Sequence, residues 1–157
     1  MVKDRADEGK AVATAFSHLG ICVADLERSQ RFYCEVLGFA PAESHEVGEE
    51  FGRLMELDGV RLRSRFLRRD GLAIELLCFA SPSCVGAPAR RPMNLLGLTH
   101  LSVRVDDVDA VAARVEECGG AMVSGTRTTL DFPGASAEFV YCTDPDGTRI
   151  ELMRLPG

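Results

Sequence analysis

The sequence lacks several patterns that would assign a function directly. No run approaches the roughly 18 apolar residues that a membrane-spanning helix needs, and residues 1–10 are charged with no apolar core after them, so we expect neither a membrane anchor nor a secretion signal. The six cysteines include no C-x-x-C pair, which excludes zinc-knuckle spacing. Neither a phosphate-binding loop nor a dinucleotide-binding glycine motif occurs.

Basic charge is also scarce. The chain has 18 Lys and Arg against 24 Asp and Glu, a net charge of -6. Nucleic acids and anionic membranes attract a basic surface, so we expect no partner of either kind. Most cysteines lie in apolar runs, which indicates buried, reduced thiols in a cytoplasmic protein. A length of 157 residues with 46% apolar content suits one globular domain or two small fused modules.

The most informative stretch occurs twice. Residues 146–152 read D-G-T-R-I-E-L, and residues 70–76 read D-G-L-A-I-E-L, so that Glu75 and Glu151 stand at the same step after an Asp-Gly turn. The two halves also open alike, with S-H-L-G-I-C-V at 17–23 and T-H-L-S-V-R-V at 99–105. The chain is therefore a tandem repeat. Each copy begins a strand with a histidine, His18 or His100, and ends one with a glutamate.

Each half is predicted to contain a strand, a helix and three further strands. Apolar residues alternate in the opening strands and follow a helical stripe in the helices, which start after Asp25 and after Asp106 or Asp107. The predicted helices span 26–37 and 108–118, with an ambiguous short helix at 49–57. The predicted strands are 16–24, 39–47, 60–67, 72–79, 98–105, 121–124, 137–142 and 148–155, with a polar loop at 125–136.

These elements predict an α+β fold in which two tandem βαβββ modules form a curved eight-stranded mixed sheet with helices outside. The predicted organisation is a loose tail at 1–14, a first module at 15–80, a proline-containing linker at 81–96 and a second module at 97–157.

The faces of the strands point to a metal site. In the four strands marked by the repeat, aliphatic residues share the face that can pack under the helices, and His18, Glu75, His100 and Glu151 share the other. Two imidazoles and two carboxylates suit one divalent ion such as Zn, Ni, Co, Fe or Mn, with open positions for water or a chelating substrate. A weakly held carboxylate, Glu151 or Glu75, could act as a catalytic base.

Simpler interpretations compete with this one. A single strand histidine is more often a core or surface residue, and a single glutamate at a strand end is nearly always solvated; the matched repetition of both favours a shared site. His45 has no counterpart in the second half and is interpreted as a surface residue. Weaker substrate-binding candidates share the faces of the four residues: Arg104 for a carboxylate or phosphate, Phe79 and Met153 as apolar walls, and Ser102, which has no partner typical of a nucleophile.

Two longer motifs carry a family resemblance. H-L-G-I-C-V-A-D-L-E-R-S-Q-R-F-Y-C-E-V-L-G-F at 18–39 and D-P-D-G-T-R-I-E-L at 144–152 resemble the opening and closing motifs of the vicinal oxygen chelate superfamily. This superfamily includes glyoxalase I, methylmalonyl-CoA epimerase, extradiol dioxygenases and the bleomycin- and fosfomycin-resistance proteins. The resemblance covers residues 15–155. It implies paired βαβββ modules, a metal in the cleft, a small-molecule substrate and a homodimer.

The resemblance also implies roles for single residues. His18, Glu75, His100 and Glu151 fall on the four ligand positions, a set similar to that of bacterial glyoxalase I. Epimerases usually carry Gln at the position of Glu75, and extradiol dioxygenases add a further histidine, for which this chain offers only His45. A glutathione-contacting Arg is replaced here by Cys22 and an Asn by Phe79, which favours a less polar substrate.

The expected function is therefore that of a metal-dependent isomerase or lyase that moves a proton through an enolate. A ring-cleaving dioxygenase and a non-enzymatic, drug-binding resistance protein are the alternatives. The four ligands could come from one chain or from two.

Overall fold

Two βαβββ modules make up the computed structural model, which describes residues 13 and 15–156. The first module contains β1 (Leu19–Cys22), α1 (Leu26–Glu35), β2 (Ala40–Val47), the short helices η1 (Glu49–Phe51) and α2 (Gly52–Met55), β3 (Arg61–Arg69) and β4 (Leu72–Ser81). The second contains β5 (Leu101–Arg104), α3 (Val108–Glu117), β6 (Ala121–Phe132), β7 (Ala135–Thr143) and β8 (Arg149–Arg154). The predicted α+β class and paired modules are confirmed; nearly all of the predicted tail lies outside the described residues.

The eight strands form two four-stranded mixed sheets, ordered β1-β4-β3-β2 and β5-β8-β7-β6. In each sheet the opening strand runs parallel to the last strand of its module, and the other pairs are antiparallel. The opening strands β1 and β5 are therefore edge strands. The predicted single sheet is thus divided into two hydrogen-bonded sheets of equal size.

Both long helices start where the sequence places an aspartate. The Asp25 carboxylate accepts a hydrogen bond from the Arg28 amide, and the Asp107 carboxylate accepts from Asp109 and Ala110, so Asp107 rather than Asp106 is the cap of α3. These caps fix where each helix begins and hence which of its faces meets the sheet.

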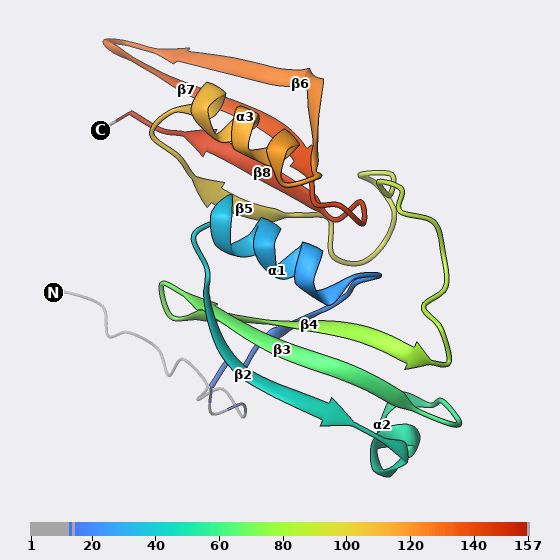
Figure 1. The fold of residues 1–157 in the computed structure, drawn as a ribbon. Coiled ribbons are helices and arrows are strands. Elements are labelled where there is room, and N and C mark those ends of the chain that lie inside the picture. Colours follow the sequence, from blue (N-terminus) through green and yellow to red (C-terminus); the bar gives the residue numbers. More distant parts are fainter. Residues whose placement is uncertain (1–12, 14, 157) are drawn as a thin grey trace, which may run out of the picture.

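One apolar core joins the two modules. Helix α1 lies between the two sheets (Figure 1), and its Phe32 and Tyr33 are completely buried in a cluster that also contains Ile74 and Leu76 of β4 and Ile150 of β8. Within the chain, α1 thus occupies the space between the modules rather than the outside that the sequence predicted. The face of each sheet opposite to its helix is left without a covering layer from the other module.

The segment 125–136, predicted as a loop, is mostly strand. Strand β6 continues to Phe132 and pairs with β7 through a tight hairpin, with an irregularity in register between Val123 and Thr128. Most side chains of β6 are exposed, so the alternation of apolar and polar residues that reveals a half-buried strand is absent.

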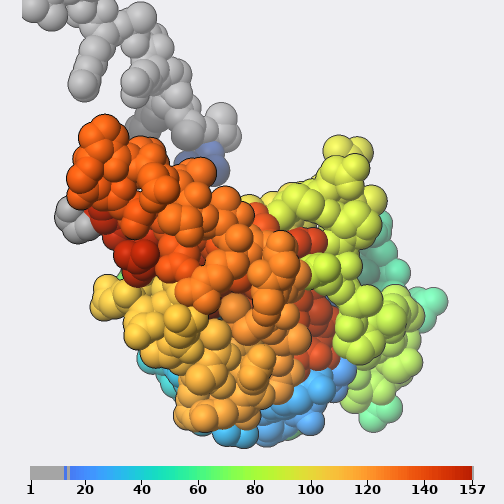
Figure 2. Space-filling view, turned by 90° about the horizontal axis from the view of Figure 1, so that it is seen from above, coloured from blue at the N-terminus to red at the C-terminus, as the bar shows by residue number. Residues whose placement is uncertain are grey.

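The linker between β4 and β5, residues 82–100, crosses from one module to the other. Figure 2 shows it in lime beside the orange second module, with red atoms of the segment around β8 visible between the two. In the described part of the chain, no helix is long and apolar enough to cross a membrane.

Candidate metal-binding half-sites

The first half-site consists of His18, just before β1, and Glu75 in the middle of β4. Pairing of these strands places Gly20 beside Glu75, and the His18 Nε2 atom lies 3.2 Å from Oε2 of Glu75. Ser17 Oγ lies 2.9 Å from the other ring nitrogen of His18. The Ser64 hydroxyl donates to Glu75 Oε1 at 2.5 Å. Each member of the pair thus has a hydroxyl partner that orients it toward the other.

The second half-site repeats this arrangement. His100 Nε2 lies 3.7 Å from Oε2 of Glu151, and Thr99 Oγ1 lies 2.9 Å from Nδ1 of His100. The Ser102 hydroxyl donates to Glu151 Oε2 at 2.8 Å. The serine comes from β5 here and from β3 in the first module. The duplication therefore extends to the hydroxyls beside the histidines, whereas the two serines come from different strands and bond different oxygens of their glutamates.

Each half-site also contains an aromatic ring that the sequence did not reveal. Phe66 lies directly opposite Glu75 in the β3–β4 pair and packs edge-on against His18, with ring centroids 5.1 Å apart. Tyr141 lies opposite Glu151 and contacts His100 at 5.5 Å. Burial and the nearby Glu151 charge raise the pKa of Tyr141. Phe66 and Tyr141 do not stand at the same distance before the two D-G-x-x-I-E-L motifs. The sequence repeat therefore does not reveal these rings, and only the strand register identifies them.

The two half-sites do not meet within the chain. Over residues 13 and 15–156, no group of three or more His, Cys, Asp or Glu side chains is placed to hold a metal ion. The reason lies in the packing: each pair lies on the sheet face opposite to the apolar face, and the apolar faces share the core. One chain therefore presents two separate His–Glu pairs.

The chemistry of each pair fits a divalent metal. Two ligands that each bond an ion at about 2.1 Å lie roughly 3 to 3.5 Å apart. The first pair, at 3.2 Å, falls within this range, and the second, at 3.7 Å, lies slightly above it. The four side chains are 17 to 35% exposed, so an ion could reach them. The hydroxyls on His18 and His100 match the outer partners that metal-binding histidines use to fix the ring. Each pair supplies two ligands, and a complete site needs more.

The weaker substrate-binding candidates lie at different distances from the half-sites. Ser102 is in the second half-site through its bond to Glu151. Met153 on β8 and Phe79 on β4 are half-buried and lie two and four residues beyond their glutamates, on the same faces. Arg104 ends β5 as an exposed residue. The structure thus gathers Ser102 at the half-site and leaves Arg104 at the end of the strand.

His45 lies closer to the first half-site than the sequence indicated. Register pairs it with Ser64, and its ring packs edge-on against Phe66 with centroids 5.9 Å apart. Phe66 therefore stands between His18 and His45 on one sheet face. His45 remains exposed.

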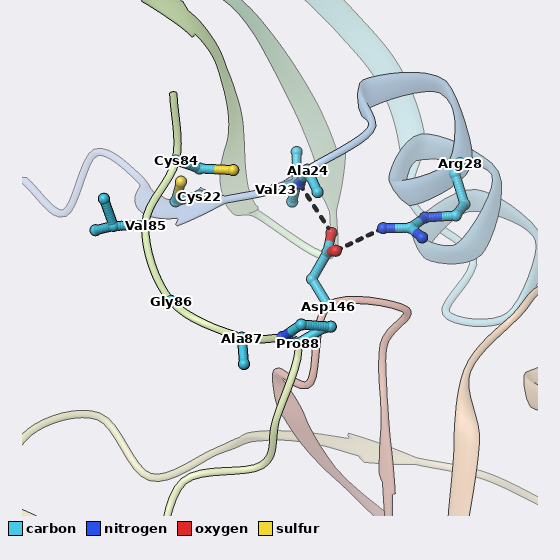
Figure 3. A pocket seen from close by; sticks show the side chains of 10 residues that line it. All are labelled: Cys22, Val23, Ala24, Arg28, Cys84, Val85, Gly86, Ala87, Pro88 and Asp146. Carbon is cyan, nitrogen blue, oxygen red and sulfur yellow. Dashed lines mark hydrogen bonds and ion pairs between the residues drawn. The ribbon is translucent and has the colours of Figure 1, made fainter. Parts of the chain in front are cut away.

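Asp146, the first residue of the second D-G-x-x-I-E-L motif, binds the modules together. Its carboxylate accepts hydrogen bonds from the Ala24 amide at 3.1 Å and from the Arg28 guanidinium at 2.5 Å (Figure 3). These groups line a cavity of about 240 Å³ together with Cys22 and the linker residue Cys84. Among the residues that the structure describes, the equivalent Asp70 pairs only with its neighbour Arg69. Only the second copy of the turn became a contact between modules.

Comparisons with known proteins agree with this architecture. A 2-epi-5-epi-valiolone epimerase from an Actinomyces species is 30% identical over 151 residues, which cover 92% of this chain and 81% of that protein. A catechol-2,3-dioxygenase from Bacillus subtilis is 30% identical over 142 residues, 87% of this chain and 41% of that protein. The crystal structure of a glyoxalase family protein from Bacillus cereus superposes with a TM-score of 0.79 at 22% identity and covers 95% of this chain and 99% of its own, which shows the same fold.

The family profile described as Glyoxalase/Bleomycin resistance protein/Dioxygenase superfamily matches residues 15–152, nearly the whole chain. Relatives in this superfamily include enzymes that are named epimerase, lyase and dioxygenase. With its two βαβββ modules and its repeated His–Glu pairs, the chain belongs to the glyoxalase, bleomycin resistance protein and dioxygenase superfamily.

Proposed function

We propose that the protein is a metal-dependent isomerase or lyase acting on a small molecule with neighbouring oxygen atoms. The observation that carries this proposal is the duplicated His–Glu pair, with an Nε2-to-carboxylate separation of 3.2 Å in one module and 3.7 Å in the other. A simple surface ion pair would not need the matching hydroxyl on the far nitrogen of both histidines. Repetition of the whole arrangement supports a ligand set.

We further propose that each complete site combines the first module of one chain with the second module of another. Each pair lies on an open sheet face, and one chain does not bring the pairs together. A homodimer with two-fold symmetry would pair the modules reciprocally and form two equal sites. Each site would then hold His18 and Glu75 of one chain with His100 and Glu151 of the other.

The side chains of this site have distinct tasks. Ser17 and Thr99 would hold the Nδ1 side of the two rings so that Nε2 faces the ion, and His18, Glu75, His100 and Glu151 would bind it. When bound, a divalent metal polarises a substrate carbonyl and lowers the cost of negative charge on its oxygen.

Proton transfer would fall to a glutamate. Glu151 or Glu75 would take the proton from the carbon beside the substrate carbonyl and return it on the same or the neighbouring carbon, which gives an epimer or an isomer. Ser64 donates to Glu75 Oε1, and Ser102 donates to Glu151 Oε2, so each serine would fix the orientation of its carboxylate. The hydroxyl contacts thus position the base.

The shared site is tested by mixing two defective chains. His18→Ala damages the first module and His100→Ala the second, so each variant alone should lose its metal. If sites form across chains, a mixed dimer contains one doubly damaged site and one intact site. Coexpression should then restore about one quarter of the wild-type metal content, as statistical mixing predicts, measured by elemental analysis.

A site built within one chain would give no restoration, and that outcome would reject the shared arrangement. As a control, His18→Ala mixed with Glu75→Ala damages the same module twice and should restore nothing under either arrangement. Full metal retention by both single variants would reject the metal site itself.

Proton transfer by a glutamate is tested by hydrogen exchange. Metal-loaded protein in D₂O should place deuterium beside the carbonyl of cyclic or linear α-hydroxyketones, followed by NMR. Glu75→Gln and Glu151→Gln should identify the base as the variant that loses exchange while its fold persists. Absence of exchange in every substrate class tested, with metal bound, would reject the isomerase proposal.

One observation favours a second candidate function. His45 lies on the same face as His18 and is separated from it by Phe66, and a relative named catechol-2,3-dioxygenase is 30% identical over 142 residues. An extra histidine would suit ring-opening oxygenation. Oxygen uptake with catechols that is lost in His45→Ala would replace the isomerase proposal.

A further inference from the structure

A cavity of about 470 Å³ opens between the two edge strands β1 and β5, a size in the range of small-molecule sites. Leu19, Ile21 and Leu101 provide apolar walls, and His100 of the second half-site reaches its lining. The linker contributes Ala87, Ala89, Arg91 and Leu98. The cavity therefore requires both modules and the linker, and it adjoins one His–Glu pair.

Arg149 is a buried, positively charged residue in the lining of this cavity. The residue is 9% exposed, at the start of β8, and its guanidinium lies 5.1 Å from the centre of the Tyr141 ring. One nitrogen donates to the backbone oxygen of Arg91 at 2.6 Å. Among the residues the structure describes, no carboxylate forms an ion pair with Arg149. Its charge is thus met by a ring and a carbonyl only.

The other charged groups of the cavity do not balance it. Asp146 also lines the cavity, but its carboxylate already binds Arg28, the Ala24 amide and the Ser29 hydroxyl. Arg91 is a second guanidinium in the lining and donates to the Leu96 carbonyl. Glu151, two residues after Arg149, is engaged by Ser102. The cavity therefore carries positive charge with no free counter-charge among these groups.

Such an arrangement suits an anion. Burial of a charge without a counter-charge is costly, and stacking on an aromatic ring offsets only part of that cost. The donors of a guanidinium that remain free form a planar fork that matches two oxygens of a carboxylate or phosphate. An oxyanion in the cavity would complete the environment of Arg149.

We infer that Arg149, assisted by Arg91, binds the carboxylate or phosphate group of a small molecule whose apolar part lies against Leu19, Ile21 and Leu98. Tyr141 contacts both Arg149 and His100, so this group would sit next to the second half-site. Binding of the anion itself requires no metal and is independent of the proposed function. Only the identification of this molecule as the substrate rests on the proposed function. The sequence had pointed to Arg104 for this role.

The test uses protein freed of metal by a chelator, so that failure of the metal proposal does not affect it. Inorganic phosphate, phenyl phosphate and phenylacetate are titrated while the Nε–H signals of arginines are followed by ¹⁵N NMR. The Arg149 signal should shift in a saturable manner with at least one probe. The phenyl compound should bind more tightly than inorganic phosphate, and the tighter phenyl compound identifies phosphate or carboxylate as the preferred group.

Variants separate binding from structure. Arg149→Met should weaken binding at least tenfold, and Arg149→Lys should retain part of it. Arg61→Met removes the same charge from an exposed position on β3 and should leave binding unchanged. If Arg149→Met does not fold, the wild-type Arg149 shift still decides the question. Equal binding by Arg149→Met, or no saturable shift with any probe, would overturn the inference.

Discussion

The Tyr33 hydroxyl donates a hydrogen bond of 3.0 Å to Oδ2 of Asp144, and this buried contact joins helix α1 of the first module to the turn before β8 in the second. Tyr33 is completely buried, and Asp144 is 2% exposed. Asp144 also accepts hydrogen bonds from the amides of Asp146 and Thr148. One carboxylate therefore shapes the D-P-D-G turn and ties it to the other module.

Tyr33→Phe should destabilise the protein by about 1–3 kcal/mol, because a buried carboxylate oxygen loses its donor. Urea unfolding measures the change. Tyr141→Phe is the matched control, since Tyr141 is only half-buried and lies on an open sheet face; its cost should be smaller. Equal costs for the two variants would show that the Tyr33 contact contributes little.

Asp144 should also give stability a distinctive pH dependence. Burial raises the pKa of this carboxyl despite the hydrogen bonds it accepts. An acid whose pKa is higher in the folded state keeps a proton that the unfolded chain has lost, so its contribution to stability falls as pH rises from the ordinary pKa to the raised one. Urea unfolding between pH 4 and 7 should show this fall for wild type relative to Asp144→Asn. A constant difference between the two proteins would contradict the raised pKa.

Gly147 offers a comparison within the repeat. Both turn glycines have positive φ, +90° for Gly147 and +79° for Gly71. A Cβ on Gly147 would come within 2.8 Å of the Ala89 backbone, whereas one on Gly71 would meet nothing within 4 Å. Both alanine variants should lose about 1–2 kcal/mol from the left-handed backbone, and Gly147→Ala should lose about 1–3 kcal/mol more from the clash. Thermal or urea unfolding measures the loss of stability in each variant. Similar losses would show that the linker backbone at Ala89 moves away at little cost.

The hydroxyls behind the histidines should affect metal affinity. Ser17→Ala and Thr99→Ala remove the partners of Nδ1 in the two half-sites. Loss of such outer partners typically weakens metal binding by about 10- to 100-fold. Competition with a chelating dye measures this affinity. Ser44→Ala, on the exposed edge strand β2, should leave it unchanged, and an unchanged affinity in both hydroxyl variants would argue that the rings are oriented by other contacts.

The cysteines should differ sharply in reactivity. Burial raises the pKa of Cys142 to about 12, and Cys118 is also buried with a raised pKa. Cys84 and Cys22 are exposed, although burial of the thiol and the neighbouring Cys84 raise the pKa of Cys22. Native protein treated with iodoacetamide near pH 8 should be labelled first at Cys84, then at Cys22, and at Cys118 and Cys142 only after urea unfolding. Peptide mass spectrometry follows the order; early labelling of Cys142 would mean that the core opens.

The alternation of apolar and polar residues predicted most of the strands but not how the two modules pack together. Strands with one buried face, such as β4 and β8, were found because Ile74 and Ile150 stand in a period of two between outward-facing residues. The part of β6 that follows residue 124 was missed because both faces of the strand are largely exposed. The place of α1 between the sheets depends on Phe32 and Tyr33 meeting the second module, which no local pattern encodes.

In the half-sites, too, the sequence predicted local features but not those that depend on pairing across the sheet. Strand faces brought His18 together with Glu75 and His100 with Glu151. The repeat predicted that all four side chains share one site, but among the described residues the two pairs do not meet within the chain. Phe66 and Tyr141 could not be identified because their role comes from register with the glutamates across the sheet. Arg149 was not among the predicted site residues, because its burial depends on the linker that covers it.

The unequal use of the two D-G turns makes the halves of this chain non-interchangeable. Asp146 holds the Ala24 amide and Arg28, whereas its duplicate Asp70, within the described part of the chain, bonds only to Arg69 beside it. A chain built from two copies of the first module would keep the strands and a His–Glu pair in each half, but it would have Arg68 at the position of Asp144, the partner of Tyr33. A protein made from two second modules would lack Tyr33 and Arg28 as partners for its turns. After the duplication, the two copies became complementary parts, each supplying contacts that the other cannot replace.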